Sequence, residues 1–158
     1  MLNGGAADRV PFMPITMMFA ADPIGVDYRQ YVSDRRVMAE VQIRTAEEFG
    51  CDQVSAISDP TREACDLGAP LAWFEDQPPS IQEGGALLKE KRNPLGLKVP
   101  GPLGGGRMHD RVRATTLLRQ RVGREKVVEG WIEGPCNRGS NLRGRWTKGI
   151  CASPAAGR

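Results

Sequence analysis

The sequence predicts an α/β fold in which parallel strands are covered by helices, and three observations carry this prediction. Val54–Ile57 is a short apolar run of the kind found in buried parallel strands. A helical pattern precedes it and ends at Gly50, where a left-handed residue commonly closes a helix. A further apolar run precedes that helix. Strand, helix and strand therefore follow one another in the order of a βαβ unit.

Composition indicates one soluble domain with a basic tail. The chain has 158 residues, of which 40% are hydrophobic and 26% charged. Five of its 22 basic residues and none of its 19 acidic residues lie from residue 134 onwards, so residues 1–133 carry a net charge of −2. Nucleic-acid binding by the folded part is therefore not expected. The apolar run at residues 12–21 is too short to cross a bilayer and has no charged leader, so we expect a cytoplasmic protein without membrane association.

The first expected strand is Val10–Thr16, which is apolar on both faces but interrupted by Pro11 and Pro14. Three large apolar side chains follow at its carboxyl end, where ligands bind in parallel α/β folds: Met17, Met18 and Phe19. They are candidate substrate-binding residues. Packing of the same side chains under a loop is the alternative.

A helix is expected over Arg35–Phe49, with Ser33 as its N-cap. The second strand follows at Gln53–Ser58, and Pro60 ends it because proline has no N–H to donate. Asp59 then projects a carboxylate from the carboxyl end of this strand, which makes it the candidate catalytic residue. The alternative is that Asp59 only caps the turn that follows.

The middle of the chain is less regular. We expect one helical turn near Glu63–Gly68, a short strand at Leu71–Phe74 and an amphipathic helix over Ile81–Lys91. Three glycines at positions 104–106 precede a helix at Met108–Val122. They match no phosphate-loop pattern and favour a flexible loop. Residues of the helix are expected to point inward at Val112, Leu118 and Val122, and outward at Arg111, Arg113, Arg119 and Arg121.

The last expected strand is Lys126–Glu133. If the sheet is parallel, Glu133 lies on the same rim as Asp59, and two carboxylates there could perform acid–base chemistry or bind substrate. A zinc site formed within this chain is not expected, because His109 is the single histidine and the four cysteines form no C-x-x-C pair.

Residues 137–158 contrast with everything before them. They are rich in Arg, Gly, Ser, Pro and Ala, and they have neither an acidic residue nor a helical stripe. We interpret 1–136 as the folded unit and 137–158 as a disordered basic tail. The hypothesis is that a frameshift or truncation replaced the native sequence near Cys136. A basic arm for nucleic acid or an acidic partner is the alternative, and a complete flavodoxin-like domain would need a helix after Glu133 that the pattern does not contain.

The chain resembles the N-terminal half of the uroporphyrinogen decarboxylase superfamily, which also contains cobamide-dependent methyltransferases. The matching stretches, in order, are Asp8-Arg9-Val10-Pro11, the helix at Tyr31–Phe49, Gly50-Cys51-Asp52, Ser58-Asp59, Glu63-Ala64, Gly68-Ala69 and Gly130–Pro135. The resemblance implies a (β/α)8 barrel, of which this chain holds about half. Such barrels span about 250 residues.

The resemblance also implies roles for particular residues. Asp59 matches the aspartate that engages pyrrole N–H groups in decarboxylases of this superfamily. Their arginine-rich loop after the first strand has no counterpart here, where Met17–Asp22 contains no arginine. An eight-carboxylate porphyrinogen needs cationic partners. The methyltransferase branch uses a zinc ion, with ligands in the other half of the barrel, and a corrinoid partner protein.

Three functions therefore remain open. The first is a tetrapyrrole decarboxylase without a cofactor, present as a fragment. The second, favoured by the missing arginines, is a zinc- and corrinoid-dependent methyltransferase that acts on a methylated small molecule. The third is an inactive remnant that binds a partner, or a second copy of itself through open sheet edges.

Overall fold

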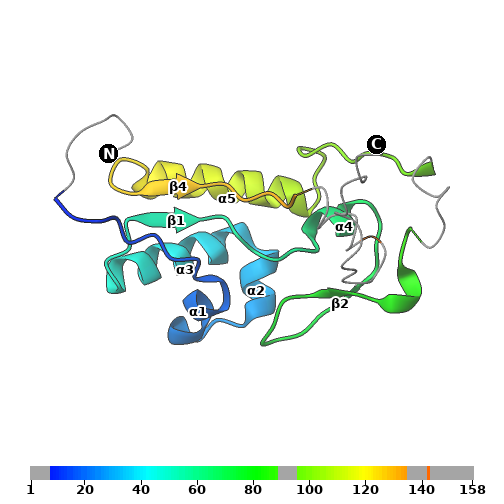
Figure 1. Ribbon diagram of the computed structural model, residues 1–158, viewed down its shortest axis with the longest axis horizontal. Helices are drawn as coiled ribbons and strands as arrows, with labels where there is room; N and C mark the ends of the chain where they lie inside the picture. The colour runs from blue at the N-terminus through cyan, green and yellow to red at the C-terminus, as the bar shows by residue number, and fades with distance from the viewer. Residues whose placement is uncertain (1–7, 89–95, 135–141, 143–158) are drawn as a thin grey trace, which may run out of the picture.

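The computed structural model describes residues 8–88, 96–134 and 142. Two long helices, α3 and α5, lie side by side against the strands β1 and β4 (Figure 1). The elements in chain order are α1 (Met17–Ala21), η1 (Asp22–Ile24), α2 (Tyr28–Ser33), α3 (Arg35–Glu48), β1 (Gln53–Ser55), α4 (Arg62–Asp66), β2 (Leu71–Ala72), β3 (Ser80–Ile81), η2 (Glu83–Gly85), α5 (Arg107–Val122) and β4 (Val127–Glu129).

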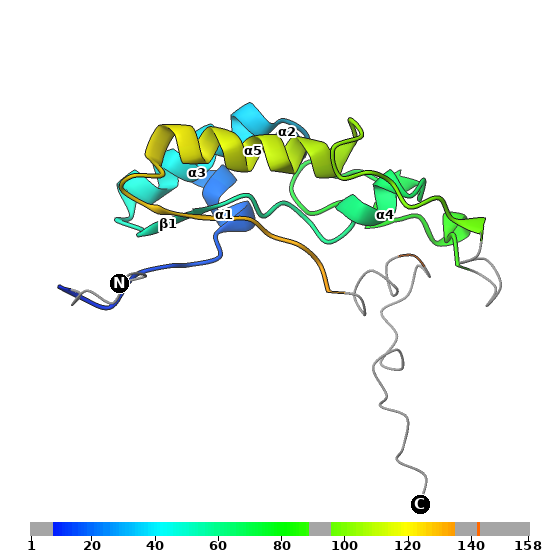
Figure 2. The same ribbon diagram turned by 90° about the horizontal axis from the view of Figure 1, so that it is seen from above.

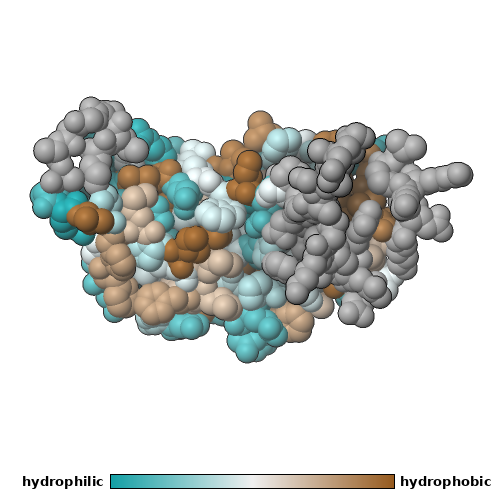
Figure 3. Space-filling view, in the orientation of Figure 1, coloured by the Kyte–Doolittle hydropathy of each residue, from teal (hydrophilic) through white to brown (hydrophobic). Residues whose placement is uncertain are grey.

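The predicted parallel pairing is confirmed. β1 and β4 run parallel, with Gln53 opposite Val127 and Ser55 opposite Glu129. Figure 2 shows both helices on one side of this strand pair. The other side faces the reader in Figure 3, where hydrophobic residues lie exposed among polar ones. The chain is thus an α/β layer whose strands are covered by helices on one face.

The core lies between α2, α3, α5 and β1. Its fully buried large side chains include Tyr31, Met38, Val54 and Leu118. Asp34 caps α3, because its carboxylate accepts a hydrogen bond from the Arg36 N–H at 2.7 Å. The prediction of Ser33 as the cap is wrong, since this residue is the last of the separate helix α2.

The segment expected as the first strand, Val10–Thr16, is not a strand. It lies beside β1, where the Phe12 carbonyl accepts from the Asp52 N–H at 2.8 Å and the Pro14 carbonyl accepts from Gln53 Nε2 at 3.3 Å. Its two prolines have no N–H to donate, which prevents a regular ladder. The prediction was therefore right about the location of the segment and wrong about its structure.

The middle of the chain forms a small hairpin. β2 pairs antiparallel with β3, and η2 follows. The helix expected over Ile81–Lys91 is therefore absent from its described part, 81–88. Gly84 and Gly85 weaken a helix there. The expected helical turn before Gly68 is confirmed as α4, and Gly68 has φ +98°, a value that favours glycine.

Helix α5 buries Leu118 and Val122 as predicted, but its N-terminal half differs from the prediction at two positions. Arg111 is 5% exposed and Val112 is 43% exposed, the reverse of the expectation. Ala114 and Leu118 are fully buried against the core, and Arg111 lies one turn before them on the same face. A buried arginine in a stripe of apolar residues cannot be found from hydrophobic periodicity, which assigns arginine outward.

No helix of the described residues has the length and apolar character needed to span a membrane. Of the predicted tail, 137–141 and 143–158 lie outside the described residues, so the boundary at residue 136 stays a prediction. Leu142 is buried in a second cluster with Ala64 and Ala69, and its carbonyl accepts from the Leu88 N–H at 3.0 Å.

Candidate functional site

Asp59 follows the carboxyl end of β1, four residues after Ser55, and its side chain is completely buried. Thr61 donates to Asp59 Oδ1 twice, from its N–H at 3.0 Å and from Oγ1 at 2.6 Å. These bonds form the turn that leads into α4. Asp59 therefore does cap this turn, as the alternative interpretation expected. Any further role of Asp59 depends on its other partner.

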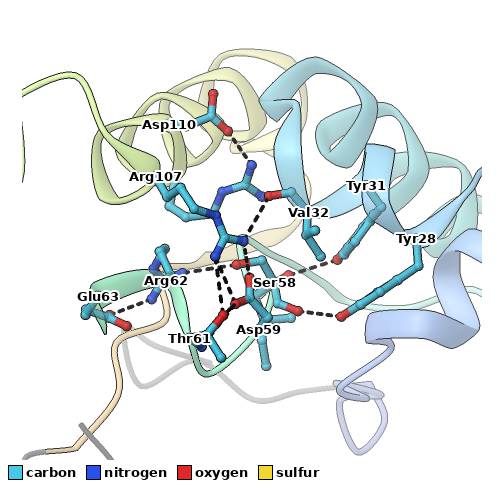
Figure 4. A network of polar contacts seen from close by, with 12 residues as sticks. Tyr28, Tyr31, Val32, Ser58, Asp59, Thr61, Arg62, Glu63, Arg107 and Asp110 are labelled. Carbon is cyan, nitrogen blue, oxygen red and sulfur yellow. Dashed lines mark hydrogen bonds and ion pairs between the residues drawn. The ribbon is translucent and has the colours of Figure 1, made fainter. Parts of the chain in front are cut away.

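That partner is Arg107, 48 residues further along the chain (Figure 4). Its guanidinium lies against both carboxylate oxygens, with Nη2 at 2.5 Å from Oδ2 and Nη1 at 3.1 Å from Oδ1. Nη2 also lies 3.4 Å from the Val32 carbonyl, and the guanidinium stacks over the Trp73 ring at 5.1 Å from its centroid. This is a bidentate ion pair, the strongest common geometry for a carboxylate and an arginine.

Asp66 positions Arg107 at the start of α5. The Asp66 carboxylate accepts hydrogen bonds from the backbone N–H groups of Arg107 and Met108, both at 2.8 Å. These are free donors of the helix N-terminus, and an acidic partner there is favourable. A Cβ atom on Gly106 would lie 2.4 Å from Asp66 Oδ1, so only glycine allows this approach.

The ion pair sets the protonation state of Asp59. Burial by itself would raise the pKa of this carboxyl, but the charge of Arg107 and hydrogen bonds from Arg107, Thr61 and Ser58 outweigh burial and hold the pKa below its ordinary value. The group is therefore ionised at neutral pH. A carboxylate in this state is a weak base and cannot donate a proton, so its chemistry is that of an acceptor that holds a cation.

Two tyrosines close the cluster from α2. Tyr28 donates to the Ser58 carbonyl, and Tyr31 donates to the Ile57 carbonyl at 2.9 Å. Burial raises the pKa of both phenols far above the ordinary value. Both are thus neutral donors that fix the backbone around Asp59.

A second buried ion pair adjoins the first. Arg62 is 2% exposed, and its Nη2 donates to Glu63 Oε1 at 2.9 Å and to the Trp131 carbonyl at 2.8 Å. It thereby ties α4 to the segment after β4. Two buried ion pairs, Asp59–Arg107 and Arg62–Glu63, therefore lie near the carboxyl end of the strand pair, and hydrogen bonds from several elements hold them in place.

Comparison with known proteins identifies the family. The family model described as uroporphyrinogen decarboxylase matches residues 1–152. The chain belongs to the uroporphyrinogen decarboxylase family.

A solved structure agrees with this assignment at the level of the fold. A methyltransferase from Methanosarcina mazei superposes with a TM-score of 0.72 at 23% sequence identity, covering 89% of this chain. The chain spans 42% of the methyltransferase chain. The prediction of an α/β fold that forms part of a (β/α)8 barrel is thereby confirmed. No curated protein matches the chain.

In this uroporphyrinogen decarboxylase family chain, the predicted apolar patch lies away from Asp59. Met17, Met18 and Phe19 form the first three residues of α1. The Phe19 ring packs on Phe49 at 5.2 Å between centroids, and Phe49 precedes β1 whereas Asp59 follows it. Phe19 thus contacts the opposite end of the strand from Asp59. A substrate-binding role for the three residues stays a prediction.

Glu133 follows β4 as Asp59 follows β1, so both come after the carboxyl ends of parallel neighbours. The ladder ends at Ser55 and Glu129, four residues before each carboxylate. Pairing of Asp59 with Glu133 for acid–base chemistry stays a prediction. Within the described chain, the carboxylate that the structure does place on the ladder is Glu129, whose Oε2 is buried and has no hydrogen-bond partner.

The described residues do not fit a metal ion. They contain no group of three His, Cys, Asp or Glu side chains placed to ligate one. Burial raises the pKa of the Cys51 and Cys65 thiols, which favours the neutral form over the thiolate that binds metals. Cys136 and Cys151 lie outside the described residues. No step through zinc is therefore derived from this part of the family fold.

Arg107 is the site residue that sequence reasoning missed. It stands at the first position of α5, directly after the three glycines, which were predicted to form a flexible loop. No spacing links it to Asp59. Two signals were available. A buried acid at the end of a strand needs a cation. In a (β/α)8 barrel the helices begin at the same rim at which the strands end, so the first residue of a helix such as α5 can lie near Asp59.

Proposed function

We propose that this chain contributes to a methyltransferase-type barrel of its family and does not decarboxylate a porphyrinogen. The observation that carries the proposal is the buried ion pair of Asp59 with Arg107. Asp59 Oδ1 accepts from both donors of Thr61 and from Arg107 Nη1, and Oδ2 accepts from Arg107 Nη2. Pyrrole N–H groups, which the corresponding aspartate of decarboxylases binds, would therefore compete with the Arg107 guanidinium for a fully buried carboxylate.

The segment before α2 supports the same conclusion. Met17–Ala21 is a short apolar helix, and it contains none of the arginines that a substrate with eight carboxylates requires. Arg29 is the next cation after this helix along the chain, and its guanidinium stacks over Trp73 at 5.5 Å from the ring centroid. The described surface is thus unsuited to a highly anionic ring.

A methyltransferase of this type needs groups that the described residues do not supply. Zinc, when bound, would convert a substrate thiol to a thiolate, and its ligands would come from the remaining part of the barrel. A corrinoid protein and a methylated small molecule would be the partners. The residues of this chain would hold the rim rigid through the Asp59–Arg107 and Arg62–Glu63 ion pairs.

The test compares both reactions in one protein. A chimera carries residues 8–134 of this chain in place of the corresponding part of the Methanosarcina mazei methyltransferase. We expect methyl transfer from methylcobalamin to a thiol in the presence of zinc, and no decarboxylation of uroporphyrinogen. Decarboxylation that is lost in Asp59→Asn would reverse the proposal. Methyl transfer that survives in a chimera with no zinc ligands would also count against it.

A second candidate is a catalytically inactive remnant that acts through binding. The observation that favours it is the sheet edge of β4, which pairs with no strand other than β1 among the described residues. Size-exclusion chromatography with near-ultraviolet circular dichroism tests it on the 158-residue chain. A monomer with sharp aromatic signals would argue against the remnant, whereas a dimer would support it.

A further inference from the structure

A cavity of about 630 Å³ is lined by the Arg62–Glu63 pair. Its other walls come from Leu67 next to α4, from one face of α5, from the segment before α5 and from Gly130–Ile132 after β4. Neither Asp59 nor Arg107 lines it, so it is a different site from the Asp59–Arg107 ion pair. Its size is in the range that takes a small organic ligand.

Most of the lining is apolar, and the charged groups in it are few. The apolar lining includes Leu67, Met108, Val112 and Ile132. The charged lining consists of Arg62, Arg111 and Glu63, which gives a net charge of +1. Arg111 pairs with Asp110, but Asp110 also pairs with Arg35, so these three residues together carry a net charge of +1. An apolar cavity beside such a group matches a ligand that has an apolar body and one negative charge.

Arg111 is the cation with donors to spare. One arm of its guanidinium, Nη2, donates to Asp110, while Nη1 has the sulfur of Met38 as its single hydrogen-bond partner among the described residues. A thioether is a weak acceptor. The Asp110 carboxylate is shared with Arg35 at 3.3 Å. A carboxylate oxygen would therefore satisfy Nη1 better than its present partner does.

The electrostatics agree with this geometry. Burial lowers the pKa of the Arg111 guanidinium, Asp110 partly restores it, and the positive charge of Arg62 lowers it again. Two buried guanidinium groups, each paired with a carboxylate, therefore line one cavity. An anion placed between them would counter the effect of the Arg62 charge on Arg111. Arg62 is engaged by Glu63 and Trp131, so Arg111 is the residue expected to bind the anion directly.

We propose that this cavity binds a monocarboxylic acid with an apolar body, with its carboxylate on Arg111 and its apolar part against Val112 and Ile132. The proposal does not depend on the function proposed above. The proposal requires the carboxylate of the ligand, because an uncharged analogue of the same shape lacks the group that pairs with the Arg111 guanidinium. A ligand with several carboxylates would leave charges buried in apolar surroundings.

The test uses 2-naphthoate and its uncharged analogue 2-naphthamide, titrated into the 158-residue chain by isothermal calorimetry. We expect the acid to bind at least about tenfold more tightly than the amide, as a hydrogen bond to a charged group provides. In Arg111→Met this preference should disappear. Arg113→Met, on an exposed position of the same helix, is the matched control and should keep it.

The comparison of acid and amide on the unaltered chain needs no variant, so it stands even if Arg111→Met fails to fold. Val112→Trp, at a partly exposed position, gives a second variant that fills the cavity and should abolish binding of the acid. Equal binding of acid and amide, or equal loss in Arg111→Met and Arg113→Met, overturns the proposal. Absence of binding, together with a dimer in sedimentation, also overturns it and assigns the cavity to a second copy of the chain.

Discussion

The two outer edges of the β1–β4 pair differ in whether their backbone groups have hydrogen-bond partners. On the edge of β1 that faces away from β4, side chains satisfy the backbone. Gln42 Oε1 accepts from the Ser55 N–H at 3.1 Å, and Tyr31 donates to the Ile57 carbonyl at 2.9 Å. We call this the closed edge. The outer edge of β4 has no strand beside it among the described residues, and we call it the open edge.

The difference teaches how a sheet edge can be closed without a strand. Gln42 also donates to the Tyr31 hydroxyl at 2.8 Å and to Thr16 Oγ1 at 3.1 Å, so one buried side chain satisfies groups from α1's entry, α2 and β1. Buried polar groups are stable only when all of them are paired. The closed edge is consequently rigid and vulnerable to single substitutions, while the open edge tolerates change.

The largest effect is expected from Arg107→Met, next to the closed edge. The Asp59 carboxylate is fully buried, so loss of its cation leaves an unpaired charge in the interior and should lower the free energy of unfolding by about 3–5 kcal/mol. Urea unfolding followed by circular dichroism measures it, with Arg113→Met as control. Asp59→Asn should be destabilising alone and stabilising in the Arg107→Met background. A loss below about 1 kcal/mol would show that the pair is not buried as described.

Next in size is Gln42→Leu, which removes the side chain that closes β1. Leucine fills a similar volume but leaves the Ser55 N–H and the Tyr31 hydroxyl without this partner, at a cost of about 3 kcal/mol. The exposed Gln120→Leu on α5 is the matched control and should change the free energy of unfolding by less than about 0.5 kcal/mol. Sedimentation should also show self-association through the exposed edge of β1. Equal stabilities of the two variants would contradict a closing role for Gln42.

The Asp59–Arg107 pair also makes the stability of the protein depend on pH. The folded-state pKa of Asp59 lies below its unfolded value, so its contribution is complete above the unfolded pKa and is lost as pH falls through the folded one. The urea concentration at the unfolding midpoint should therefore fall as the pH is lowered from about 5. Asp59→Asn should reduce this dependence of the midpoint on pH. A profile of unchanged slope in Asp59→Asn would assign the acid sensitivity to other carboxylates.

The smallest effect is expected beside the open edge. Ile132 is 78% exposed, so Ile132→Ala should change the free energy of unfolding by less than about 0.5 kcal/mol. The matched substitution Ile43→Ala, at a residue 4% exposed, should cost about 2–4 kcal/mol. Thermal unfolding of the two variants makes the comparison. A large loss in Ile132→Ala would mean that another chain covers the open edge in solution.

Several features followed from local sequence alone. The helix at Arg35–Glu48 and its end at Gly50, with φ +65°, follow from apolar periodicity and a left-handed glycine. That the strands run parallel was predicted from the alternation of strands and helices, although the strand–helix–strand unit expected from Val10–Thr16 and Gln53–Ser58 does not form. Asp59 was predicted as a site residue from its place after a strand.

Tertiary structure decided what each polar side chain does. Whether Asp59 is a free acid or the partner of a buried cation depends on Arg107, which is distant in the chain, and the outer edge of β1 is closed by Gln42 from α3. Arg111 is buried because the packing of α5 on α3 places it beside Met38. Periodicity and caps act over one or two turns, so the sequence determined the elements and their order. Ion pairs and edge closure act between segments brought together only by folding, so the chemistry of the rim was decided by the tertiary structure.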